Sequence, residues 1–354
     1  KLQAAGAYGI NNGGRIVGFI NNTIPSWWST TWRSNIFLYY ASQFGVVEQK
    51  AAASWNGLTS NPSLQAIYQL PRVDSSSNSV RFRAVNNQNF AVGWTQDGLA
   101  IGTGVIKRLG TSGATTQFTG SNSIRPWSIS DEMLRTGSYY RKTFVVGQAR
   151  FGATNRSRAF ACPISNQVIT GEFCPLQDLG VLGTPNPDAA VSEARDVAIP
   201  ACSNQNPWVV GWSQDAVTSP KRGMVCSLNY NGACLPNSKK ELPPFDNGDL
   251  ANPSKFSEAR AVNSTGVIVG RAARLPGTGA IEYAALWKPT PSSSSGYRVY
   301  NLLDNPQLVV PCGNAFCPAR DFYSRLITFN GINTRNDIVG IGERVDRPGV
   351  IVAF

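Results

Sequence analysis

The chain has 354 residues, of which 42% are hydrophobic, so it can bury a large core without help from a metal ion. It contains no histidine, which excludes serine–histidine catalysis, cysteine–histidine catalysis and a histidine-bound zinc in this chain. The net charge of +11 is spread along the chain. Such a diffuse basic surface favours anionic partners such as acidic polysaccharide or lipopolysaccharide, and favours nucleic acid less; alternatively, the charge serves only solubility.

Six copies of one strand–turn–strand unit follow one another along the chain, and each copy ends in two apolar residues and a glycine. In chain order they are INNGGRIVG ending at Gly18, VNNQNFAVG at Gly93, a longer form ending in FVVG at Gly147, PWVVG at Gly211, VNSTGVIVG at Gly270 and INTRNDIVG at Gly340. Intervals of 75, 54, 64, 59 and 70 residues separate these glycines, so the loops vary while the unit persists. We interpret the glycine as permitting close sheet-to-sheet approach or a local bend.

Further strands are predicted after each hairpin. Copy five is followed by EYAALW as a third strand and YRVYNLL as a fourth, and the third strand recurs as NIFLYY, SRAFACP, RGMVCSL and VIVAF. No stretch has a convincing helical stripe, since the best candidate, LQAIYQL near Leu64, is short. The first residue is Lys1 and no signal peptide is visible, which indicates a mature or trimmed chain. No run of 18 apolar residues exists, so we expect no membrane span.

These elements predict an all-β fold, and the repeated four-stranded unit predicts one six-bladed β-propeller with about four antiparallel strands per blade. A solenoid and a pair of β-sandwiches are the alternatives. The last copy stops at Phe354 after its third strand, so either the N-terminal KLQAA completes that blade, or the blade lacks its outer strand, or the chain has been trimmed. The blades of this single domain, 1–354, are expected at about 1–75, 76–120, 121–188, 189–253, 254–318 and 319–354.

The repeat resembles the HAF extracellular repeat of bacterial secreted and surface proteins, named for a His-Ala-Phe triplet. The matching segments are ARAVNSTGVIVG with YAALW, AYGINNGGRIVG with NIFLYY, and SRAF at Ser157 to Phe160. This chain departs from the family pattern because it has no histidine, and Arg158, Tyr283 and Asn35 stand near the expected places. The resemblance implies an extracellular location and a propeller-like fold, and it implies no activity.

Six of the seven cysteines fall into three pairs that each flank a turn-like stretch. The pairs are Cys162 with Cys174, Cys226 with Cys234, and Cys312 with Cys317. Two facing strands of a hairpin bring such residues within disulfide range, while the absence of CxxC spacing and of histidine argues against a metal site. We therefore expect three disulfides and an oxidising compartment, with Cys202 left over.

One position, two residues before the Ile/Val-Asn of each copy, is predicted to recur around the centre of a propeller. Through the copies it is occupied by Tyr8, Arg83, Trp127, Arg195, Arg260 and Asn330. Its arginines and aromatic residues could bind a carboxylate, a sulfate or a sugar ring. Alternatively, because SEAR recurs at Ser192 to Arg195 and Ser257 to Arg260, the arginines could form ion pairs that join the blades.

Tryptophans form two further groups. Trp27, Trp28 and Trp32 crowd into the loop IPSWWSTTWRS, where they could stack on sugars or a partner, or could cap the channel. Trp94 and Trp212 recur in GWTQD and GWSQD, which indicates core packing.

The remaining chemistry would have to come from carboxylates. Asp97 and Asp215 occupy matching turns, and Asp131 and Glu132 are adjacent, but no pattern places two of them across a substrate. Calcium at Asn336 to Ile338 or Asp246 to Leu250 has no spaced acidic array behind it, so no metal or other cofactor is expected.

The sequence thus favours a secreted, non-catalytic propeller that binds an acidic glycan on a surface, or another surface protein. A carboxylate-based carbohydrate-active enzyme and a self-assembling subunit of an extracellular filament or matrix are the alternatives. The expected location is extracellular or at the cell surface, with the periplasm as a further option.

Overall fold

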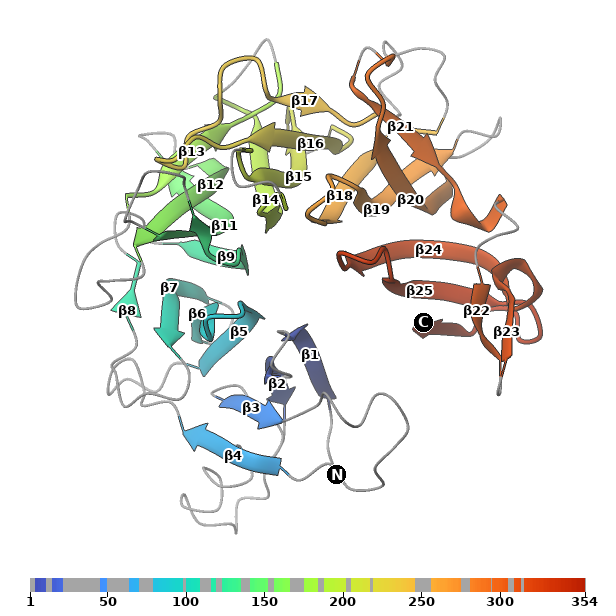
Figure 1. The fold of residues 1–354 in the computed structure, drawn as a ribbon, viewed down its shortest axis with the longest axis horizontal. Coiled ribbons are helices and arrows are strands. Elements are labelled where there is room, and N and C mark those ends of the chain that lie inside the picture. Colours follow the sequence, from blue (N-terminus) through green and yellow to red (C-terminus); the bar gives the residue numbers. More distant parts are fainter. Residues whose placement is uncertain are drawn as a thin grey trace. The chain divides into compact units, whose positions relative to one another are not determined.

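The fold is that of a computed structural model, drawn in Figure 1. It describes residues 4–10, 15–21, 45–49, 64–69, 79–97, 100–108, 116–118, 123–134, 141–151, 156–165, 175–183, 188–201, 205–216, 219–245, 256–274, 281–293, 295–304, 309–312 and 315–353. Strands dominate these residues, and the helical elements among them are the short 3-10 turns η2 (Leu302–Asp304) and η3 (Ala319–Asp321). None of the described helices is long and apolar enough to cross a membrane.

The chain divides into two compact units. Unit 1 comprises residues 1–155 and 161–177, and unit 2 comprises residues 156–160 and 178–354. The division passes through one sheet, so it does not coincide with a predicted blade boundary. The prediction of a single domain stays a prediction.

Unit 1 begins with two four-stranded antiparallel sheets whose strands are paired in chain order. The first sheet contains β1 (Ala4–Ile10), β2 (Arg15–Asn21), β3 (Gly45–Gln49) and β4 (Leu64–Gln69). The second contains β5 (Ser79–Val85), β6 (Phe90–Asp97), β7 (Ala100–Arg108) and β8 (Thr116–Gln117). The short LQAIYQL segment is therefore a strand, as the all-β prediction requires.

A five-stranded sheet contains the division between the units. Its strands are β9 (Ile124–Ile129), β10 (Met133–Leu134), β11 (Arg141–Phe151), β12 (Arg156–Ser165) and β13 (Gln177–Gly180). They are ordered β10-β11-β12-β13, and β9 pairs with β11.

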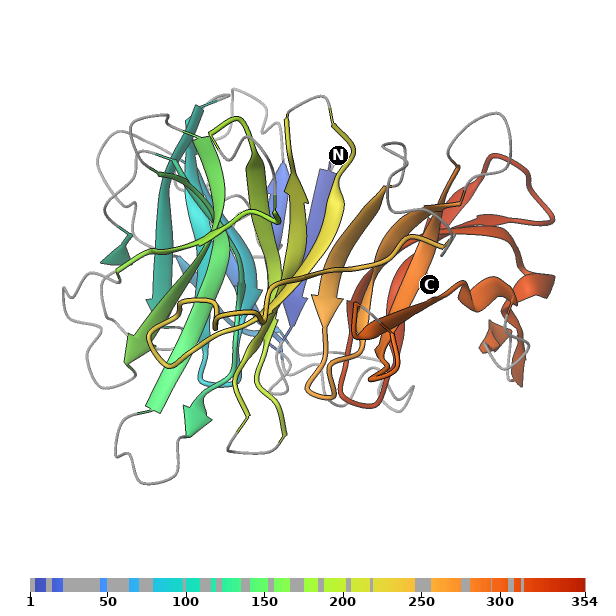
Figure 2. The same ribbon diagram turned by 90° about the horizontal axis from the view of Figure 1, so that it is seen from above.

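Unit 2 continues with two four-stranded sheets, a short hairpin and a three-stranded sheet. The four-stranded sheets are β14 (Val191–Ala198), β15 (Trp208–Gln214), β16 (Arg222–Ser227) and β17 (Lys240–Glu241), then β18 (Ser257–Val262), β19 (Ile268–Arg274), β20 (Ile281–Pro289) and β21 (Tyr297–Tyr300). The hairpin is β22 (Val309–Cys312) with β23 (Ala315–Pro318), and the last sheet contains β24 (Tyr323–Ile332), β25 (Ile338–Arg344) and β26 (Ile351–Ala353). Figure 2 shows the strands of these sheets running side by side.

The sheets of unit 2 stack face to face through apolar layers. Val225 and Leu242, from the β14–β17 sheet and the chain just after it, pack with Trp287 of β20 in one buried cluster. On the other side of the β18–β21 sheet, Leu286 of β20 packs with Phe329 of β24. The central sheet therefore buries both faces, which a single hairpin could not do alone.

The all-β prediction is confirmed, and the antiparallel four-stranded unit is present in several sheets. The predicted strands RGMVCSL, EYAALW and SRAFACP correspond to β16, β20 and β12, and β26 covers most of VIVAF. YRVYNLL forms a strand only over β21 before the chain turns into η2. NIFLYY lies outside the described residues.

The hairpin turn that recurs in the copies is held by an asparagine. The Asn263 side-chain oxygen accepts hydrogen bonds from the backbone N–H groups of Thr265 and Val267, both at 3.1 Å, and Gly266 takes a φ of +78°. Asn333 closes the turn of copy six in the same way. The Ile/Val-Asn pattern is therefore a turn signal, because the amide oxygen replaces an acceptor that the short loop cannot supply.

The same asparagines connect one repeat to the next. The Asn263 side-chain amide donates to the Asn333 carbonyl at 3.1 Å, and the Asn86 amide donates to the carbonyl of Ser130 at 2.9 Å. These pairs occupy equivalent places in consecutive copies, the first pair in unit 2 and the second in unit 1. Asn86 and Asn263 are 2% and 3% exposed, so each would leave buried polar groups unpaired if removed.

Candidate functional site

The position that varies between copies is a β-bulge in every copy. In β14, Ala194 pairs with Gly211 and Asp196 pairs with Val210, so Arg195 has no opposite residue. The register skips the corresponding residue in the other copies, namely Tyr8, Arg83, Trp127, Arg260 and Asn330. A bulge redirects a side chain and increases the local twist of the strand. The position therefore recurs in the repeat because the backbone is bulged there in each copy.

The repeat glycine pairs with the residue next to this bulge. A Cβ atom at Gly211 would lie 1.9 Å from the Glu193 carbonyl oxygen, and one at Gly270 would lie 2.0 Å from the Glu258 carbonyl oxygen. At these two positions glycine is thus required by the bulged strand of its own hairpin. Of the two interpretations of the repeat glycine, a local bend and a close approach between two sheets, these contacts favour the local bend at Gly211 and Gly270.

Arg195 and Arg260 belong to an ion-pair cluster around the buried carboxylate of Glu258, whose side chain is 1% exposed. Arg271 Nη2 lies 2.7 Å from Glu258 Oε2, Lys221 Nζ lies 3.6 Å from the same oxygen, and Arg260 Nε and Arg195 Nη2 lie 3.5 and 3.8 Å from Oε1. Burial opposes ionisation of Glu258, but the charges of Arg260, Lys221 and Arg271 outweigh it and lower its pKa below the ordinary value.

This cluster joins neighbouring sheets, since Arg195 extends from β14 and Glu258 from β18. Arg195 also pairs with Glu193 at 2.5 Å, and Arg260 donates to the Asn330 side-chain oxygen at 2.8 Å. The surroundings of Arg195 and Arg260 therefore match the alternative of ion pairs between sheets. Ligand binding by these two arginines stays a prediction.

Arg83 and Trp127 meet in unit 1 through aromatic contacts. The Arg83 guanidinium lies 4.8 Å from the ring centroids of both Trp94 and Trp127, and the two rings lie 5.1 Å apart. Trp94 and Trp212 are 5% and 6% exposed, which confirms the prediction that they pack in the core. Lys221 covers the Trp212 ring at 4.1 Å, so both tryptophans carry a cation on one face.

The structure leaves other predicted binding residues untested. Trp27, Trp28 and Trp32 lie outside the described residues, and Tyr8 is placed in β1 without its side chain.

The cysteine predictions agree with the described residues. Cys226 and Cys234 form a disulfide with 5.9 Å between their Cα atoms. Cys162 and Cys317 are also disulfide-bonded, but the side chains of their expected partners, Cys174 and Cys312, lie outside the described residues.

Three of the four carboxylates considered for catalysis are engaged in other contacts, and the side chain of the fourth, Asp97, lies outside the described residues. Asp215 accepts a hydrogen bond from Arg222, and Glu132 pairs with Arg141 at 2.9 Å. Asp131 accepts two hydrogen bonds from Asn87 of the preceding copy. Among the residues whose side chains the structure describes, no three cysteine or acidic groups gather as a metal site.

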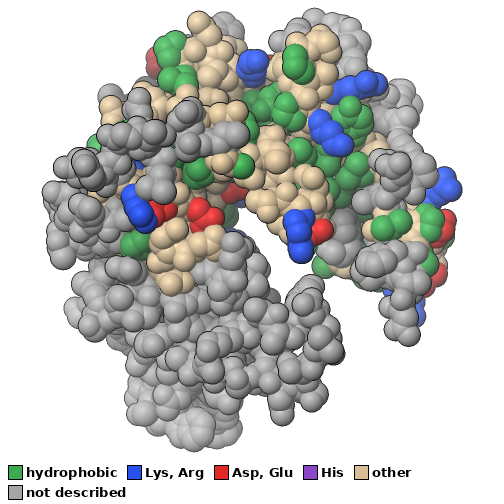
Figure 3. Space-filling view, viewed as in Figure 1, with side chains coloured by type: hydrophobic (Ala, Val, Ile, Leu, Met, Phe, Trp, Pro, Cys, Tyr) green, Lys and Arg blue, Asp and Glu red, His purple; other side chains and the backbone are tan. Residues whose placement is uncertain are grey.

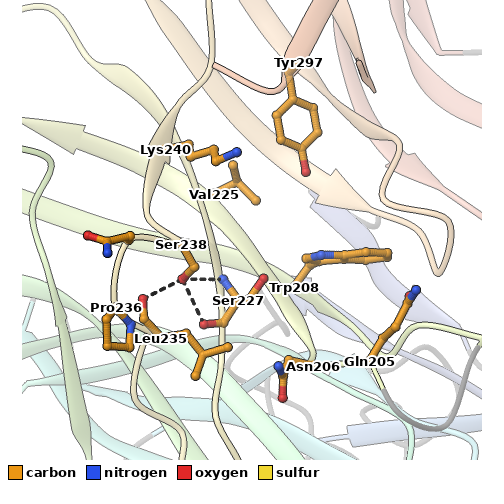
Figure 4. A pocket seen from close by; sticks show the side chains of 11 residues that line it. Gln205, Asn206, Trp208, Val225, Ser227, Leu235, Pro236, Ser238, Lys240 and Tyr297 are labelled. Atoms are coloured by element: carbon orange, nitrogen blue, oxygen red, sulfur yellow. Dashed lines mark hydrogen bonds between the residues drawn. The ribbon is translucent and has the colours of Figure 1, made fainter. Parts of the chain in front are cut away.

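An open pocket in unit 2 combines aromatic and polar side chains that the sequence did not bring together. It has a volume of about 610 Å³, within the usual range of ligand pockets. Its lining consists of Gln205, Asn206, Trp208, Val225, Ser227, Leu235, Pro236, Asn237, Ser238, Lys240 and Tyr297. Figure 4 shows Trp208 and Tyr297 entering it from different sheets, with the Tyr297 hydroxyl directed into the space.

Two local features build the pocket wall. The Cys226–Cys234 disulfide closes the loop that leads into Leu235 and Pro236. The Ser238 hydroxyl then accepts from the Ser227 N–H at 3.1 Å and donates to the Leu235 carbonyl at 2.8 Å (Figure 4). The disulfide and these hydrogen bonds therefore form this wall of the pocket without a ligand.

The groups that face the pocket are available for hydrogen bonds. Among the residues that the structure describes, the Trp208 indole N–H, the Tyr297 hydroxyl and the Lys240 ammonium have no hydrogen-bond or ion-pair partner. Burial raises the pKa of Tyr297 to about 12, so its hydroxyl is neutral at physiological pH. All the lining residues are described, and none is acidic.

Sequence reasoning missed this pocket, although two signals for it were present. Trp208 stands three residues before Gly211, in a copy that lacks the turn asparagine, and Lys240 belongs to the Lys239-Lys240 pair. Compared with known proteins, the chain matches no family model and no curated protein.

Proposed function

We propose that this protein is a non-catalytic carbohydrate-binding protein whose ligand occupies the Trp208–Tyr297 pocket. The observation that carries the proposal is a pocket with two aromatic residues whose polar ends have no partner among the described residues. Aromatic rings pack against the apolar faces of sugar rings, while amides and hydroxyls bind the sugar hydroxyls. Asn206 and Gln205 supply exposed amides at the same pocket.

Binding is favoured over hydrolysis because of the lining chemistry. Glycoside hydrolysis commonly needs two carboxyl groups on either side of the scissile bond, and the described lining contains none.

We further propose that the six repeats close into one six-bladed propeller related to HAF-repeat proteins. Support comes from the bulge at the same position in each copy and from the asparagine bonds between consecutive copies. The disulfides support secretion, since such bonds persist outside the reducing cytosol.

A second candidate, self-association, has a specific observation in its favour. Around the last sheet Val339 and Ile351 are both 57% exposed, and Val345 and Val350 are 48% and 42% exposed. Multi-angle light scattering over a range of protein concentrations would separate a monomer from an assembling subunit. On the face drawn in Figure 3, the lysine and arginine side chains of the described residues are scattered rather than gathered, so this face does not favour nucleic acid.

A glycan array followed by calorimetric titration tests the proposed site. Trp208→Ala should weaken binding at least tenfold, as expected for a central aromatic anchor. Asn206→Ala, at an exposed position, should weaken it less and leave the melting temperature unchanged.

The triple variant Trp27→Ala, Trp28→Ala, Trp32→Ala is the control for the tryptophan loop. If it abolishes binding while Trp208→Ala does not, the loop is the site and the pocket is not.

A further inference from the structure

The ammonium group of Lys240 is the one basic group among the described residues that line the pocket, and the alternation of side chains along β17 turns it toward the pocket. Lys240 and Glu241 are consecutive in β17, so their side chains point to opposite faces. Glu241 pairs with Arg222 at 3.0 Å on its own side. Lys240 thus has no acidic partner among the described residues and faces the pocket.

A glycine turn makes room for this ammonium group. Gly296 precedes Tyr297 and has a φ of +75°, and a Cβ atom there would lie 2.8 Å from Lys240 Nζ. Lys240 is therefore close to the backbone that carries Tyr297, and Figure 4 shows its amino group pointing toward the Tyr297 side of the pocket.

We propose that the pocket selects acidic sugars, with the carboxylate of a uronic acid ring bound by Lys240 and the Tyr297 hydroxyl while the ring packs on Trp208. This inference rests on the proposed carbohydrate-binding function. It names the class of sugar and the residue that distinguishes it from a neutral sugar.

A carboxylate fits this arrangement better than a sulfate or phosphate. Phosphate-type groups are commonly held by arginine forks and several donors, and the described lining contains one lysine and no arginine. One ammonium and one neutral hydroxyl match the two oxygens of a carboxylate. At neutral pH the Tyr297 hydroxyl keeps its proton and can donate it in a hydrogen bond.

The test compares uronate oligosaccharides of several linkages with their methyl esters, which have the same rings without the charge. Calorimetric titration of the full chain should give about tenfold tighter binding of the acid than of the ester, the range for a hydrogen-bonded ion pair. Lys240→Gln should remove this preference while the ester binds as before. Sulfated oligosaccharides, as a further arm, should bind more weakly than the uronates.

Lys288→Gln is the matched control. It removes the same charge from an exposed position in unit 2 that does not line the pocket, where Lys288 lies 5.7 Å from the Tyr300 ring. It should keep the acid preference. If Lys240→Gln and Lys288→Gln reduce the preference for the acid over the ester equally, the preference comes from the overall positive charge of the protein, and the inference is wrong.

The outcomes separate the inference from the proposed function. If acid and ester bind equally well and Trp208→Ala abolishes both, carbohydrate binding stands and acid selection is wrong. If no acidic or neutral sugar binds, both are wrong.

Discussion

The replacement of Gly270 by alanine tests whether the bulge explains the repeat. The new Cβ would lie 2.0 Å from the Glu258 carbonyl oxygen and 3.1 Å from the Ala259 Cα, and both neighbours are backbone atoms. Real Cβ atoms essentially never approach closer than 3.0 Å, so β18 and β19 must separate by roughly 1 Å.

The expected cost follows from what this movement breaks. The ladder on either side of the bulge joins Glu258 with Arg271 and Ala261 with Val269. Losing about two net hydrogen bonds at roughly 1 kcal/mol each, with overpacking of about 1–3 kcal/mol, gives about 3–5 kcal/mol. At about 2–4 °C per kcal/mol, the melting temperature should fall by roughly 10 °C.

Thermal unfolding followed by circular dichroism is the assay, and Gly183→Ala is its control. Gly183 is exposed, and a Cβ there would meet nothing within 4 Å, so its replacement should change stability by less than about 0.5 kcal/mol. Gly211→Ala should resemble Gly270→Ala. Equal melting temperatures for the Gly270 and Gly183 variants would refute the explanation.

Two further predictions concern the repeat and the ion pairs. Asn86→Ala and Asn263→Ala should each lower the free energy of unfolding by about 2–4 kcal/mol, because buried polar groups lose their partners. If the repeats form one closed propeller, calorimetry should show a single unfolding transition whose temperature falls in both variants. Two transitions, each lowered in temperature by only one of the variants, would contradict closure. Because the folded state lowers the pKa of Glu258 below its ordinary 4.5, its contribution should be present above pH 4.5 and lost as the pH falls further. Glu258→Gln should therefore be less stable at pH 7 and lose less stability on acidification in urea titrations; an unchanged pH profile would argue against the ion-pair cluster.

Local chemistry explains why the hairpins could be predicted from sequence. The turn asparagine and the glycine opposite the bulge act within a few residues, so Asn263 and Gly270 mark the hairpin without knowledge of the fold. The bulge itself could not be read from the sequence. The pattern of apolar and polar residues along a strand does not show where one extra residue is inserted. The direction of the Arg195 side chain therefore could not be predicted, and a ligand site and an ion pair remained equally compatible with the sequence.

The pocket depends on contacts between segments far apart in the chain. Trp208 belongs to β15 and Tyr297 to β21, and their common pocket follows from the stacking of two sheets. Trp208 lies in the repeat segment PWVVG and Tyr297 in the predicted strand YRVYNLL, but nothing in either segment indicates that they share a pocket. By contrast, the Cys226–Cys234 bond joins positions 8 residues apart and was predictable from spacing alone.

Nuclear magnetic resonance of the tryptophan indole groups tests the proposed binding site most directly. The chain contains nine tryptophans, and Trp208→Phe would identify the Trp208 signal by its loss. During titration with a glycan that binds, the Trp208 indole N–H should shift, while that of the buried Trp212 should stay in place. Saturable binding without movement of the Trp208 signal would contradict the account.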